Sequence, residues 1–201
     1  ALYYLQNIFE VSLVDSNFVV GGAILVATPL FVFWGWLSDK VGRKKIMLSG
    51  MALAALTYYP IYGAMAAFAP VDTGQPFLFG YIGYNPVMLS VLIFIQVLWV
   101  TMVYGPIAAF LVELFPTKIR YTSMSLPYHI GNGVFGGLVP IIGLQMISVT
   151  GNNYAGLWYP IFIAATCAIV GSLLLKETNR IDIDDAGSSY AAQDEAAGKA
   201  K

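Results

Sequence analysis

Residues 16–45 read SNFVVGGAILVATPLFVFWGWLSDKVGRKK. Residues 16–38 contain no charged side chain, whereas most of residues 39–45 are charged. A helix needs about 20 predominantly apolar residues to cross the roughly 30 Å of hydrocarbon in a bilayer. This stretch therefore predicts one membrane-spanning helix that ends in a short charged loop.

The rest of the chain repeats this pattern. Three further uncharged runs cover residues 46–71, 73–112 and 121–175, and the two longest are interrupted by Gly, Pro, Asn and Asp residues that favour turns. Residues 1–8 are apolar but too short to span, so they indicate the end of a further helix whose start is missing. The predicted fold class is an all-α, polytopic membrane helix bundle over residues 1–175, with spans at 1–8 (partial), 17–37, 46–69, 87–112, 123–149 and 157–175.

The composition excludes several classes of protein. The chain is 58% hydrophobic and 10% charged, which is far from the balance of a water-soluble domain. A net charge of -1 leaves no basic footprint for a nucleic acid. The single cysteine, Cys167, lies in an apolar run and is expected to be a packing residue. No nucleophile with a base, paired carboxylates or metal-ligand cluster lies within the spans, so the sequence predicts no enzyme, no cofactor and no metal site.

The basic residues indicate the orientation. With five spans, all ten Lys and Arg residues fall on one side of the membrane, and the opposite loops carry only Glu10, Asp15 and Asp72. Because cytoplasmic loops are enriched in Lys and Arg, this side is expected to be the cytoplasm of a bacterial inner (plasma) membrane protein. Residues 176–201 would then form a cytoplasmic tail, and their low apolar content predicts that it is largely disordered.

The loop at residues 35–45 reads GWLSDKVGRKK and mixes glycines with charges of both signs. We expect Gly35 to let a neighbouring helix approach closely and Gly42 to permit a sharp turn. Asp39 can accept hydrogen bonds from Arg43 or from a helix N-terminus. The alternative is a simple topology anchor, which explains Lys44 and Lys45 but not the spacing of the other four residues.

This loop resembles the signature Gly-x-x-x-Asp-Lys/Arg-x-Gly-Arg-Lys/Arg of the major facilitator superfamily. Residues 105–120, GPIAAFLVELFPTKIR, are similar to the run that follows the tenth helix of its sugar and metabolite symporters. Residues 176–179, KETN, resemble the Pro-Glu-Thr motif after the last helix, with Lys176 in place of proline. The metabolite:proton symporter branch is the most similar. The resemblance implies the C-terminal half of a twelve-helix fold, whose N-terminal six-helix half, or a dimer partner, completes it.

The same resemblance implies a cytoplasmic gate in which charges at neighbouring helix ends pair and separate during inward opening. The alternative is static capping of the helix ends. The residues assigned to the gate are Gly35, Asp39, Gly42, Arg43, Glu113, Arg120 and Glu177.

Few polar groups lie inside the predicted spans, which makes them candidates for a substrate or proton pathway. His129 is the only ionisable side chain in a span other than tyrosine and cysteine, and histidine is the side-chain type best suited to gaining and losing a proton near neutral pH. Gln96 and Asn132 are expected near the bilayer midplane, where transporters bind substrate. Hydrogen bonding that only holds helices together is the alternative. The candidates are Gln96, Tyr104, Tyr128, His129 and Asn132.

The resulting hypothesis is a secondary active transporter that couples protons to the symport of a small polar metabolite by alternating access. An organic acid or an osmolyte is the expected substrate. A sugar is disfavoured because Ala109 stands where the sugar porters usually have tryptophan. A structural or assembly subunit is the alternative, since six helices alone would expose a polar cavity face to lipid and are not expected to transport.

Overall fold

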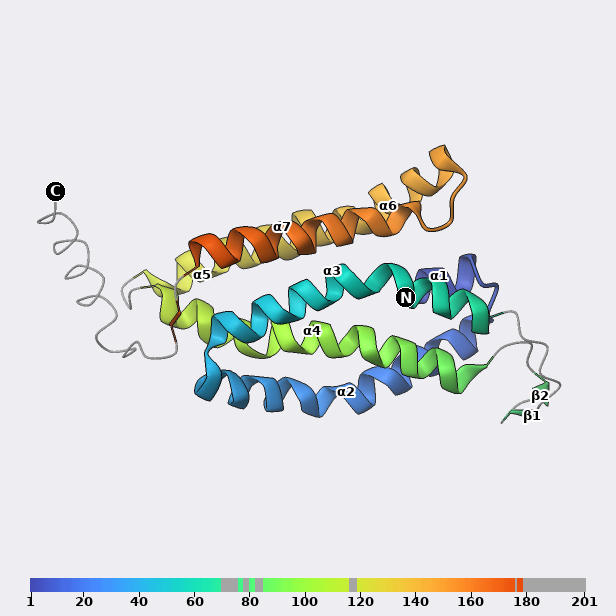
Figure 1. The fold of residues 1–201 in the computed structure, drawn as a ribbon, viewed down its shortest axis with the longest axis horizontal. Helices are drawn as coiled ribbons and strands as arrows, with labels where there is room; N and C mark the ends of the chain where they lie inside the picture. The colour runs from blue at the N-terminus through green and yellow to red at the C-terminus, as the bar shows by residue number, and fades with distance from the viewer. Residues whose placement is uncertain (70–75, 78–79, 82–84, 116–118, 176, 179–201) are drawn as a thin grey trace, which may run out of the picture.

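The computed structural model describes residues 1–69, 76–77, 80–81, 85–115, 119–175 and 177–178. These residues form a bundle of long helices, and a two-stranded antiparallel pair, β1 (Pro76–Phe77) and β2 (Gly80–Tyr81), lies beyond one end of the bundle (Figure 1). The all-α class is confirmed. The helices are α1 (Leu2–Asn7), α2 (Leu13–Val41), α3 (Arg43–Phe68), α4 (Pro86–Leu114), α5 (Arg120–His129), η1 (Ile130–Gly136), α6 (Gly137–Thr150), η2 (Ala155–Leu157) and α7 (Trp158–Leu174).

Five of these segments are long and apolar enough to cross a membrane: 13–41, 43–68, 86–114, 120–150 and 155–174. Most of them continue a few residues beyond the predicted spans, because charged and polar residues at a membrane surface can still belong to the helix. The predicted disordered tail lies outside the described residues from position 179 onward, whereas residues 177 and 178 are placed.

The helix ends carry the expected local signals. Ser12 caps α2 by accepting a hydrogen bond from the backbone N–H of Asp15 at 3.1 Å. Asn85 caps α4 in the same way through Met88, at 3.0 Å, and Pro86 occupies the first turn. Gly42 separates α2 from α3 with a φ of +116°, a backbone conformation that side chains rarely allow. One glycine therefore turns the chain between two spans, as the sequence predicts.

Helix α4 lies between α2 and α3, and α7 packs on the other side of α3 (Figure 1). The close contact between α2 and α4 depends on Gly105. A Cβ atom added at Gly105 would lie 2.9 Å from the carbonyl oxygen of Phe31 and 3.2 Å from the backbone nitrogen of Gly35. A Cβ atom added at Gly35 would lie 3.6 Å from the carbonyl oxygen of Gly105, an ordinary van der Waals distance, so the close approach expected of Gly35 requires Gly105 instead.

The fourth span is not one regular helix. The sequence predicts a single helix over residues 123–149, but the structure divides it into α5, the π-helical segment η1 and α6. Pro127 lacks the N–H needed for one helical hydrogen bond. The glycine-rich residues 131–137 have few side chains that would hinder the wider turn of a π-helix. Apart from the adjacent helix backbone, no atom of the described residues lies within 4 Å of a Cβ position at Gly131, Gly133 or Gly137, so these three positions are not packed against another helix.

Candidate functional site

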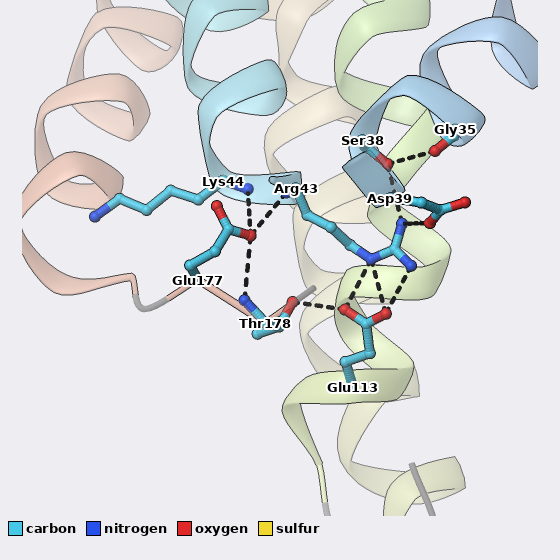
Figure 2. A network of polar contacts seen from close by, with 8 residues as sticks. All are labelled: Gly35, Ser38, Asp39, Arg43, Lys44, Glu113, Glu177 and Thr178. Atoms are coloured by element: carbon cyan, nitrogen blue, oxygen red, sulfur yellow. Dashed lines mark hydrogen bonds and ion pairs between the residues drawn. The ribbon is translucent and has the colours of Figure 1, made fainter. Parts of the chain in front are cut away.

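Charged and polar side chains converge at one end of the bundle, where α2 turns into α3, α4 ends and the chain leaves α7 (Figure 2). We call this the basic end. The group, here named the charge cluster, is buried except for Asp39 and Glu177. It consists of Ser38, Asp39, Arg43, Glu113, Glu177 and Thr178.

Arg43 is the cation at the centre of the cluster. Its Nε lies 2.7 Å and 2.8 Å from the two carboxylate oxygens of Glu113, and its Nη2 lies 2.6 Å from Oε1. Its Nη1 is bound to Asp39 at 2.7 Å and donates to Ser38 Oγ at 2.9 Å. The guanidinium fork therefore joins the end of α2 to the end of α4, a geometry that arginine provides and lysine does not.

The two ion pairs differ in environment. The side chains of Arg43 and Glu113 are only 10% and 7% exposed, whereas that of Asp39 is 58% exposed. Burial strengthens the attraction between opposite charges and also makes an unpaired charge costly. The Arg43–Glu113 pair is therefore the energetic centre of the cluster, and Asp39 is available to a partner or to water.

Glu177 binds the start of α3 rather than the guanidinium. Its Oε1 accepts hydrogen bonds from the backbone N–H groups of Arg43, at 2.7 Å, and Lys44, at 3.3 Å. Gly42, the N-cap residue, has no side chain to do so, and a carboxylate suits the positive end of the helix dipole. A Cβ atom on Gly42 would collide with this carboxylate. Of the two partners expected for Asp39, Arg43 or a helix N-terminus, the structure shows Arg43, and Glu177 caps α3.

The other cations at this end make separate contacts. Lys44 Nζ donates to the carbonyl oxygen of Ser172 in α7 at 2.8 Å. Arg120, which the sequence grouped with the gate, donates from Nε to the carbonyl oxygen of Phe115 at 3.1 Å and so stabilises the turn between α4 and α5. Of the seven predicted gate residues, the structure thus brings Asp39, Gly42, Arg43, Glu113 and Glu177 into direct contact. Gly35 lies opposite Gly105 of α4, and its carbonyl oxygen accepts a 2.6 Å hydrogen bond from Ser38 Oγ.

Sequence reasoning missed two members of the cluster. Ser38 directly precedes Asp39 within the quoted loop, and Thr178 directly follows Glu177 within KETN. Both side chains are fully buried although both residues are polar. Each lies inside a motif that was interpreted through its charged residues alone. The sequence signal for both was a hydroxyl residue next to a carboxylate at a helix end.

The polar groups inside the spans do not form one site. Gln96 is buried in α4 and donates from Nε2 to Met65 Sδ at 3.2 Å. Tyr104, two turns further along α4, donates its hydroxyl to Asn132 Oδ1 at 2.8 Å. His129 Nδ1 lies 2.8 Å from the carbonyl oxygen of Ser125, within its own helix. The predicted set therefore separates into a buried glutamine, an α4–η1 hydrogen bond and a histidine bound locally.

Two cavities lie beside these groups. One of about 590 Å³ lies between α3, α4, α7 and the fourth span, and Tyr128 and Asn132 contribute to its mostly apolar lining. Another of about 290 Å³ is bordered by Gln96, Tyr58 and Tyr62. Asn132 and Gln96 therefore face different spaces. Among the described residues no three His, Cys, Asp or Glu side chains are placed to hold a metal ion.

Comparison with known proteins adds an independent line of evidence. The model of the family described as Major Facilitator Superfamily matches residues 1–189. A citrate-proton symporter of Klebsiella pneumoniae is 30% identical over 90% of the chain and 37% of its own length. An alpha-ketoglutarate permease of Escherichia coli is 32% identical over 87% of the chain and 38% of its own length.

A putative proline/betaine transporter of Staphylococcus haemolyticus is 26% identical over 86% of the chain and 32% of its own length. The chain thus spans about a third of the length of the curated relatives it matches. No solved structure gives a significant match.

Proposed function

The chain belongs to the Major Facilitator Superfamily, a family of transporters and not of enzymes, and from this premise we propose that it forms part of a proton-coupled symporter of a small polar metabolite. The match over residues 1–189 is the observation that carries the proposal. The five membrane-spanning segments agree with it. Transport would proceed by alternating access, in which the two halves of the protein rock about a site near the bilayer midplane.

The relatives favour particular substrates. Those compared above are named for citrate with protons, for alpha-ketoglutarate and for proline or betaine. We therefore propose an organic acid or a zwitterionic osmolyte as the substrate class. Because the chain covers about a third of these relatives, a second set of six helices, from an N-terminal half or a second copy, would complete the pathway.

The charge cluster is proposed to be the cytoplasmic gate. By the positive-inside rule the basic end would face the cytoplasm, and the bacterial relatives favour a bacterial inner membrane. In the structure the Arg43–Glu113 ion pair is formed and buried, which supports a state in which the gate is closed at this end. Inward opening would expose this pair to water, which weakens the attraction between the two charges. Arg120, in the turn between α4 and α5, would move with the same end.

Different structural observations support the individual candidates for the transport pathway. Gln96 and Asn132 each border a cavity inside the bundle, and Tyr104 fixes the orientation of Asn132. Tyr128 borders the same cavity as Asn132. His129 is proposed as a proton carrier because it lies in the fourth span with its side chain exposed, and imidazole suits proton exchange.

An uptake assay tests the proposal. The native-length protein is reconstituted in liposomes that contain a pH-sensitive dye, and citrate, 2-oxoglutarate, proline and betaine are added in turn. We expect one of these classes to acidify the lumen, and Asn132→Ala to raise KM more than the control Ser148→Ala, whose hydroxyl bonds only within its own helix. Proton movement with none of the four substrates would overturn the assignment.

A further inference from the structure

Glu177 and Thr178, which follow α7 in the chain, lie in the charge cluster (Figure 2). The Thr178 side chain is 0% exposed, and its Oγ1 donates a hydrogen bond of 2.7 Å to Glu113 Oε2. The backbone N–H of Thr178 donates to Glu177 Oε1 at 3.2 Å, the same oxygen that caps α3. The segment after α7 therefore contacts the start of α3 and the end of α4 at once.

Glu113 is a carboxylate in an unfavourable place. It lies one residue before the end of α4, where the helix dipole disfavours negative charge, and it is buried away from water. Arg43 cannot turn all of its donors toward it, because Nη1 is held by Asp39 and Ser38. The Thr178 hydroxyl supplies a further donor on the opposite side of the carboxylate from a different part of the chain.

We propose that Thr178 is a positioning residue that holds Glu113 in register with Arg43, and that Glu177 and Thr178 together form a clasp on the gate. This inference deepens the proposed function, since it rests on the charge cluster being the gate. Because Glu177 binds the start of α3 and Thr178 binds the end of α4, separation of α3 from α4 at the basic end requires release of at least one of the two clasp residues.

Substitution at Thr178 tests the hydroxyl. Hydrogen exchange is measured by mass spectrometry on the native-length protein in detergent, at the amides of residues 43–48 in the first turn of α3. Thr178→Val keeps the shape of the side chain and removes the donor, so we expect exchange there to accelerate about tenfold. Thr178→Ser restores the donor and should restore slow exchange. Ser172→Ala, which removes a hydroxyl bonded only within α7, is the matched control.

A double-variant cycle distinguishes positioning from general support. If Thr178 acts through Glu113, Thr178→Val should have little further effect in a Glu113→Gln background. Equal acceleration in both backgrounds, or no rescue by serine, would overturn the proposal. Residues 95–103 in the middle of α4 serve as an internal reference, since their exchange should be unchanged.

Two truncations test the clasp as a unit. A chain that ends after Arg180 retains Glu177 and Thr178 and should exchange like the full chain at residues 43–48. A chain that ends after Leu175 loses both and should exchange at least as fast as Thr178→Val; should this shorter chain fail to fold, the point variants alone decide. The exchange readout needs no substrate, so a protein that keeps the clasp but moves no protons would refute the transport assignment alone.

Discussion

Arg43→Met should be far more damaging than the loss of its exposed partner, Asp39. Methionine has a similar length but no charge, so Glu113 would remain as an unpaired carboxylate that is only 7% exposed. Breaking a buried pair by removing one partner typically costs about 3–5 kcal/mol of stability. Asp39 is 58% exposed, and an exposed ion pair is worth at most about 1 kcal/mol, so Asp39→Asn should cost no more than that.

Unfolding of the purified protein in detergent, by heat or by added SDS, measures these losses. The double variant Arg43→Met/Glu113→Gln removes both buried charges and should recover most of the stability that Arg43→Met loses. The reasoning is refuted if the two single losses add in the double variant, or if Asp39→Asn and Arg43→Met are equally destabilising. Either result would mean that water reaches the pair despite its burial in the structure.

Three further outcomes are expected. Gly105→Ala should destabilise the bundle by about 1–3 kcal/mol because the new Cβ would lie 2.9 Å from the carbonyl oxygen of Phe31. At Gly63 a new Cβ would meet nothing within 4 Å. Gly63→Ala should therefore be neutral, or stabilise the protein by up to about 1 kcal/mol, in the same thermal assay. Tyr104→Phe should cost under about 1 kcal/mol of stability, since hydrogen bonds between membrane helices are individually modest. The same Tyr104→Phe change should raise the KM for uptake by freeing Asn132, and an unchanged KM would remove Asn132 from the substrate site.

Much of the fold could be predicted from the sequence because the bilayer imposes strong rules. A span needs a long uncharged run, and the charges in this chain fall only between such runs. Gly42 was identified correctly because the turn needs a positive φ, whereas the close helix approach expected of Gly35 depends on Gly105 in the facing helix. The division of the fourth span could not be predicted, since glycine and proline are common in membrane helices whether or not they form a wider turn.

The charge cluster was predictable in membership but not in pairing. Motif positions pointed to Asp39, Arg43, Glu113 and Glu177, yet nothing in the sequence determines which carboxylate faces the guanidinium and which faces the start of α3. That choice depends on where the chain leaves α7 relative to Gly42, which is a tertiary property. Thr178 was overlooked for the same reason, because its burial is set by the packing of three separate segments.

The π-helical segment η1 gives the fourth span an angular degree of freedom. Each residue of an α-helix advances the side-chain direction by about 100°, so converting one wide turn to an ordinary one rotates everything on one side of it by a comparable step. α6 is held against η2 by the close approach of Gly143 and Gly156, while a Cβ atom at Gly131 or Gly133 of η1 would meet no atom within 4 Å from other parts of the described chain. Conversion of η1 to ordinary α-helical geometry would therefore rotate the half of the span that bears Tyr128 about the helix axis relative to α6.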